Sequence, residues 1–157
     1  MRKTIAPYFA FGATALMLAP VAAFAGIGEE LSLAQTHALL AYRTGGRGER
    51  GIATARMHIH IVINCMVGPG GDGYDLTAPD LGPGRGGAPA APPNMAPCAA
   101  DKTSKGALKD AAGAEQKQKV MAVIALAKAD LDITDNDKLT EAATALADAL
   151  GEAKDAK

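Results

Sequence analysis

The sequence predicts a small α+β domain with one strand or small sheet, a loop rich in proline and glycine, and a C-terminal antiparallel helical hairpin. Three observations lead to this prediction. Residues 57–67 alternate with a period of two, residues 68–98 contain eight glycines and seven prolines, and residues 120–150 place apolar side chains at helical spacing. We divide the chain into four segments, 1–25, 26–67, 68–98 and 99–157.

The first 25 residues have the three-part layout of a secretory signal peptide. Arg2 and Lys3 precede an apolar run, and the small-residue pattern at 23–25 comes before Gly26. An uncleaved signal-anchor helix is the alternative, because the apolar run approaches the roughly 20 residues that span a bilayer. We expect cleavage before Gly26, which leaves a mature protein in the periplasm or outside the cell, without a membrane span.

The composition of the mature chain argues against nucleic-acid binding. Without Arg2 and Lys3 the chain keeps 14 basic and 17 acidic residues, so its formal net charge is −3 (14 − 17). Its two aromatic residues, Tyr42 and Tyr74, offer few platforms for stacking bases. Because both the electrostatic and the stacking contributions are missing, we expect no nucleic-acid partner.

The segment 26–67 predicts a helix followed by a strand. Residues 29–43 begin with two glutamates and end with an arginine, and glycines follow at 45 and 46, which is the order that a helix prefers. The stretch 44–51 is predicted to be a flexible turn. In residues 57–67 one parity is apolar and predicts a buried face, whereas the other carries His58, His60 and Asn64 and predicts an exposed face. The chain contains no second run of this quality. The partner strand therefore comes from elsewhere in the chain or from another chain.

The two cysteines predict a disulfide. The mature chain contains only Cys65 and Cys98, and an oxidising compartment favours pairing of an even number of thiols. The alternative is two unpaired thiols. The bond would pin both ends of the loop 68–98, for which we expect irregular structure.

The C-terminal segment predicts helices. Apolar residues recur at spacings of four, three and four in two runs, and residues 132–136 connect them. We expect an antiparallel hairpin, with Thr134 or Asp135 near the second N-cap and Gly151 near the end of the second helix. A shorter helical piece is predicted at about 104–112.

The connection between the two helices contains a candidate calcium site. It resembles the EF-hand loop at four positions that carry oxygen ligands, namely Asp130, Asp132, Thr134 and Glu141. It departs from that loop where Asp135 replaces the glycine of the sharp turn. The alternative is an acidic, solvated turn that caps two helices.

The pair His58 and His60 is a second candidate metal site, for Zn²⁺ or Cu²⁺. Two imidazoles at positions i and i+2 of a strand lie on one face, but a protein site normally needs a third ligand held nearby. His37 is the one other imidazole in the chain. The alternative is that both histidines are polar residues on the solvent or partner face of the strand.

These observations favour an exported, non-enzymatic interaction or structural protein of the cell envelope. We can assign no catalytic triad of serine, histidine and aspartate in this sequence, and no catalytic pair of cysteine and histidine. We expect no resident cofactor, and self-association or binding to an envelope protein through residues 57–67, because an unpaired strand edge tends to be covered. The alternative function is a small metal-binding protein that holds Ca²⁺ or Zn²⁺ weakly at one of the two candidate sites.

Overall fold

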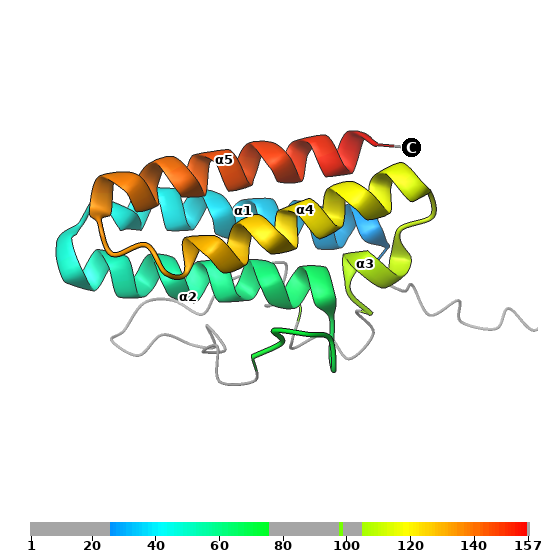
Figure 1. The fold of residues 1–157 in the computed structure, drawn as a ribbon, viewed down its shortest axis with the longest axis horizontal. Coiled ribbons are helices and arrows are strands. Elements are labelled where there is room, and N and C mark those ends of the chain that lie inside the picture. The colour runs from blue at the N-terminus through cyan, green and yellow to red at the C-terminus, as the bar shows by residue number, and fades with distance from the viewer. Residues whose placement is uncertain (1–25, 76–97, 99–104, 157) are drawn as a thin grey trace, which may run out of the picture.

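Four long helices and one short helix make up the part of the chain that the structure, a computed structural model, describes: residues 26–75, 98 and 105–156. Figure 1 shows the long helices lying alongside one another, with the short helix at one end. Helix α1 packs most extensively against α2 and α5, and α4 lies on α2 and α5. The helices are α1 (Ile27–Gly45), α2 (Gly48–Val67), α3 (Ala107–Asp110), α4 (Ala114–Asp130) and α5 (Asn136–Asp155).

The predicted α+β class is wrong, because the described residues contain helices and no strand. Residues 57–67 form the second half of α2. The period of two was misleading because this half of the helix is buried nearly all round: Ile61, Val62 and Ile63 are consecutive, and each is at most 1% exposed. A short run of apolar residues does not distinguish a buried helix from a strand by periodicity alone. The helix also removes the need for a second strand, since it satisfies its own backbone hydrogen bonds.

The predicted N-terminal helix is confirmed as α1, whereas the predicted turn 44–51 is shorter than expected. Helix α2 begins at Gly48, so most of that glycine-rich stretch is helical. Gly51 lies where α2 crosses close to the end of α1, and a Cβ there would overlap the Thr44 carbonyl oxygen. The glycine therefore permits a tight connection, which makes α1 and α2 antiparallel neighbours.

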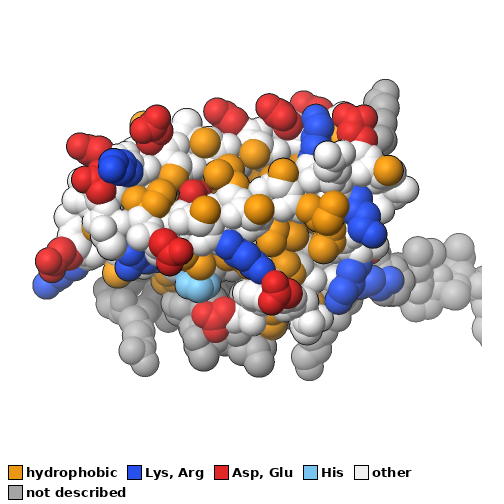
Figure 2. All heavy atoms as spheres, in the orientation of Figure 1, with side chains coloured by type: hydrophobic (Ala, Val, Ile, Leu, Met, Phe, Trp, Pro, Cys, Tyr) orange, Lys and Arg blue, Asp and Glu red, His pale blue; other side chains and the backbone are white. Residues whose placement is uncertain are grey.

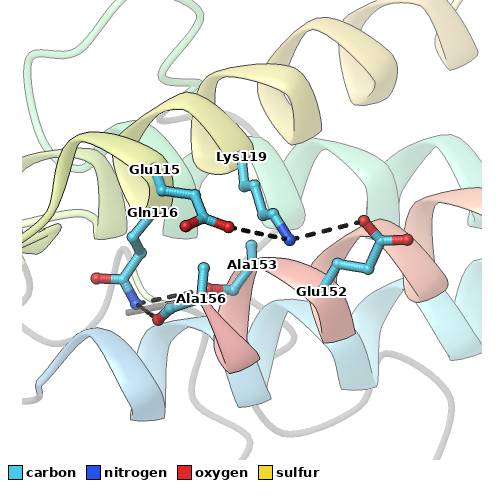
Figure 3. Close-up of polar contacts among 6 residues, drawn as sticks. All are labelled: Glu115, Gln116, Lys119, Glu152, Ala153 and Ala156. Carbon is cyan, nitrogen blue, oxygen red and sulfur yellow. Dashed lines mark hydrogen bonds and ion pairs between the residues drawn. The ribbon is translucent and has the colours of Figure 1, made fainter.

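The predicted C-terminal hairpin is confirmed as α4 and α5, and the short piece at 104–112 as α3. Asp135 is the N-cap of α5, where its side chain accepts the Lys138 backbone N–H at 2.9 Å. Helix α5 continues beyond Gly151 to Asp155. Its last turn is held by the Gln116 Nε2 amide, which donates to the carbonyls of Ala153 and Ala156 (Figure 3).

Lys119 joins the same seam from its position on α4. Its Nζ lies 3.8 Å from Glu115 and 4.0 Å from Glu152, a residue of α5 (Figure 3). Ion pairs this exposed contribute little stability. They do place Lys119 on the side of α4 that faces α5.

The disulfide between Cys65 and Cys98 is present and joins α2 to residue 98 across a separation of 33 residues. Cys65 is fully buried. We expect the Cys65→Ala, Cys98→Ala double variant to lose roughly 2–4 kcal/mol of unfolding free energy in chemical denaturation, because it removes the constraint on the unfolded chain.

Reduction of the wild type should reproduce that loss. Mass spectrometry of protein purified without reductant should give a mass two hydrogens below the reduced value. Two thiols that alkylate without reductant would contradict the assignment.

Several expectations lie outside the described residues. These include the signal peptide at 1–25 and most of the loop 68–98, of which residues 76–97 are not described. Among the helices that are described, none combines the length and the apolar character that crossing a membrane requires.

Candidate functional site

A cleft of about 250 Å³ opens where the end of α2, the turn after it, α3 and α4 meet. Its floor is apolar and its rim is charged. Met121 is the most exposed large apolar residue of the described chain, at 48%. We call this feature the α2–α3–α4 groove, and its lining consists of Val67, Gly71, Asp72, Leu108, Lys109, Met121, Ile124 and Lys128.

Two glycines allow the wall formed by α3 to approach the end of α2. Gly68 and Gly106 have φ values of +67° and +91°, and their backbones are in direct contact. A Cβ on Gly68 would overlap the Lys105 carbonyl oxygen, and one on Gly106 would overlap the Gly68 nitrogen. The Gly106 N–H also donates to the buried Glu30 Oε1 at 3.0 Å, which ties α3 to α1. Leu108 is thus positioned by backbone contacts that tolerate no side chain.

The turn that follows α2 is anchored on both sides of the groove. The buried Asn64 side chain donates to the Asp75 carbonyl and accepts the Asp75 N–H, each at 2.9 Å. Lys128 on α4 donates to Asp72 Oδ2 at 2.7 Å, and Lys109 on α3 donates to the Pro69 carbonyl at 3.3 Å. The two bonds of the buried Asn64 fix the turn on α2, whereas the two lysine contacts lie at the exposed rim.

The rim of the groove is predominantly cationic. Figure 2 shows hydrophobic side chains gathered along α4 and towards α3, with basic and acidic side chains beside them. Lys109 and Lys128 line the groove, and Lys117 lies one helical turn before Met121 on the same face of α4. The one acid of the lining, Asp72, has a side chain that is 98% exposed, and the hydrogen bond from Lys128 lowers its pKa.

A second cleft, of about 240 Å³, lies between the start of α2 and the connection from α4 to α5. It is lined by Glu49, Ile52, Ala53, Arg56 and Thr134. Arg56 Nη2 donates to the Ile133 carbonyl at 2.9 Å, so this guanidinium ties α2 to the connection. Since Glu49 and Arg56 are both present, this cleft shows no preference for a ligand of one charge.

The structure separates His58 from His60 and brings His58 to His37. Residues i and i+2 of a helix point about 200° apart, so the two histidines of the predicted metal pair lie on different faces of α2. His60 Nδ1 lies 3.8 Å from Asp75 Oδ2. His58 is only 6% exposed, whereas the sequence predicted that its side chain lies on an exposed face. Its Nδ1 lies 3.1 Å from Nδ1 of His37 on α1.

Burial keeps both imidazoles of the His37–His58 pair neutral. Desolvation lowers the pKa of each from 6.5 to about 4, and for His37 the charge of His58 adds to the effect. One Nδ1 must donate to the other. His37 Nε2 is buried without a hydrogen-bond partner among the described residues. We assign the shared proton to His37 Nδ1, since Nε2 is then a bare acceptor rather than an unpaired donor.

The residues of the predicted calcium site are spread over three environments. Asp130 ends α4 and is 3% exposed, Asp132 and Thr134 are exposed in the connection, and Glu141 is exposed on α5. Asp135 is engaged as the N-cap of α5. Across residues 26–75, 98 and 105–156, no cluster of three or more histidine, cysteine, aspartate or glutamate side chains is arranged to hold a metal ion.

Asp130 is a buried carboxyl at the C-terminal end of α4, where the helix dipole disfavours a negative charge. Burial raises its pKa from 3.8 to about 6, and the C-terminus of α4 adds no stabilisation for a negative charge. The pKa of Asp130 is higher in the folded protein than in the unfolded chain, so protonation of this carboxyl stabilises the folded state. That stabilisation is present at low pH and is lost as the pH rises through 6.

Asp130→Asn is therefore expected to stabilise the protein at pH 7 by up to about 3 kcal/mol, measured as the free energy of unfolding in denaturant. The gain should vanish at pH 4, where the folded wild type is protonated. Asp132→Asn, at an exposed position, is the matched control and should change stability by less than about 0.5 kcal/mol. A loss of stability in Asp130→Asn at pH 7 would show that the carboxylate has a partner.

The surface predicted for partner binding, residues 57–67, is the core of the bundle. Ile59, Ile61 and Met66 are all fully buried there. A strand edge is absent from the described residues, so association by strand addition through this segment has no structural basis. The groove that replaces it combines residues from α2, α3 and α4, which no local pattern connects. The one signal in the sequence was Met121, a large apolar residue that falls outside the apolar stripe of Val120, Ile124 and Ala127.

Comparison with family models, with curated proteins and with solved structures gave no match for this chain.

Proposed function

We propose that the protein is an exported, non-enzymatic interaction module that binds a partner protein through the α2–α3–α4 groove. The single observation that carries the proposal is a preformed cleft with an apolar floor. Met121, which belongs to its lining, is 48% exposed. A concave apolar site with a polar rim is the usual form of a binding site. Met121 supports this reading further, because methionine adapts its shape to the surface that it contacts.

The non-enzymatic part of the proposal is supported by where the reactive side chains lie. Both cysteines are joined in the disulfide, and His37 and His58 face each other in the core. Neither kind of group lines the groove. The site offers apolar surface and lysine side chains, which favour binding over acid–base or nucleophilic chemistry.

Export of the protein is supported by the disulfide, which persists in oxidising compartments. The signal-peptide layout of residues 1–25 points in the same direction. We therefore place the binding partner in the periplasm, on the envelope surface or outside the cell.

Photo-crosslinking in the cells that produce the protein tests this proposal. A benzophenone amino acid is introduced at Met121 and, as a matched control, at Leu39 on α1, which is 46% exposed. We expect a discrete higher-mass adduct in the envelope fraction from position 121 and none from position 39. Equal labelling from both positions, or no adduct at 121, would contradict the proposal.

A further inference from the structure

We propose that the occupant of the α2–α3–α4 groove is an acidic amphipathic helix from another protein. The inference rests on the proposed function and identifies the chemistry of the partner. It depends on the size of the cleft, the residues that form its floor and the charges around its rim.

The size of the groove favours a side chain over a free small molecule. Its volume of about 250 Å³ is below the range of about 300–1,000 Å³ that is typical of small-molecule sites. The floor is formed by Val67, Leu108 and Ile124, which come from three different helices. Such a cleft accepts one or two apolar side chains that project from a larger partner.

The lining also selects the conformation of the partner. Strand addition needs an exposed sheet edge, and the described residues contain no strand. Recognition of a polyproline segment needs an aromatic-lined groove, and no aromatic side chain appears in this lining. A helix that inserts its apolar stripe between α3 and α4, beside Met121, is the remaining common mode of peptide recognition.

The charges of the rim favour a partner helix that carries acidic residues beside its apolar stripe. Lys109 and Lys128 line the groove, and Lys117 extends the same face of α4 by one turn. The Asp72 carboxylate offsets one of these charges, but it is almost fully exposed and its pair with Lys128 is correspondingly weak. The rim therefore attracts carboxylates and repels lysine and arginine.

A second copy of this chain is a poorer occupant. Among the residues that the structure describes, its other exposed large apolar side chains are Leu39 and Tyr42, which lie together on α1. Arg43 follows them directly and would meet the lysines of the rim. Charge complementarity thus favours a different protein.

Three synthetic helical peptides with the same apolar stripe test this inference. Their remaining positions are glutamate, glutamine or lysine, and binding to the full mature protein is measured by fluorescence anisotropy. We expect the glutamate peptide to bind about threefold to tenfold more tightly than the glutamine peptide, and the lysine peptide to bind most weakly. The difference should shrink at high salt, because exposed charges are screened.

Two sets of variants make the result specific. Replacing the three rim lysines together, Lys109→Gln, Lys117→Gln and Lys128→Gln, should remove the preference for glutamate, whereas Lys119→Gln, on the α5 side of α4, should keep it. Equal binding of the glutamate and glutamine peptides, with both weakened by Met121→Glu, would overturn the acidic partner and leave the proposed function intact. Binding that Met121→Glu does not alter would overturn both. Failure of all three peptides, with dimerisation that Met121→Glu abolishes, would assign the groove to a second copy.

Discussion

Acidification from pH 7 to pH 5 is expected to remove about 4 kcal/mol of folding free energy through His37 and His58. Their folded-state pKa values are lowered from 6.5 to about 4, so the unfolded chain binds more protons within this window. The stabilisation is complete above pH 6.5 and declines as the pH falls towards 4. At pH 5 each histidine accounts for about 2 kcal/mol.

Urea unfolding at several pH values measures this effect. The comparison must be between variants, because protonation of Asp130 stabilises the folded protein over part of the same range. In the His37→Gln, His58→Gln double variant the acid-dependent loss should disappear, while His60→Gln, which leaves the buried pair intact, should behave as the wild type. An unchanged pH profile in the double variant would show that the buried pair is not the acid-sensitive element.

Gly106→Ala is expected to cost about 2–5 kcal/mol. The residue has a φ of +91°, which an alanine adopts only with strain, and its new Cβ would overlap the backbone at Gly68. Relief of the overlap would separate α3 from the end of α2 and weaken the hydrogen bond from the Gly106 N–H to Glu30. The groove should open at the same time, because Leu108 belongs to α3.

Gly28→Ala is the control for this substitution. Gly28 lies in the first turn of α1, and nothing stands within 4 Å of a Cβ placed there. Alanine at this helical position should be neutral or stabilise the protein by up to about 1 kcal/mol. Thermal unfolding of both variants gives the comparison, and similar melting temperatures would show that the contact between Gly68 and Gly106 is not tight.

The sequence predicted the helices whose faces differ clearly in polarity. In α5, Leu139, Leu146 and Leu150 are buried at helical spacing, and this hairpin was predicted correctly. Residues 57–67 were misassigned as a strand because α2 buries adjacent residues against α1, α4 and α5, which erases the helical period. The length of the run and the lack of a pairing strand were the signals that favoured a helix.

The histidine pair follows once α1 and α2 are known to be antiparallel. His37 and His58 lie at nearly equal distances along the chain from the connection at 46–47, so the hairpin brings them to the same level. The prediction paired His58 with His60 because a strand places residues i and i+2 on one face, whereas a helix does not. The groove could not be predicted in this way, since Leu108 and Met121 meet only through the packing of α3 on the bundle.

Methyl NMR of methionine tests most directly the claim that the α2–α3–α4 groove is the binding site. The chain from Gly26 onward carries four methionines, Met57, Met66, Met95 and Met121, and ¹³C-methyl labelling reports on each of them. Addition of the tightest-binding of the three peptides should shift the Met121 resonance and leave that of the fully buried Met66 in place. A peptide that binds while the Met121 resonance stays unchanged would contradict the claim.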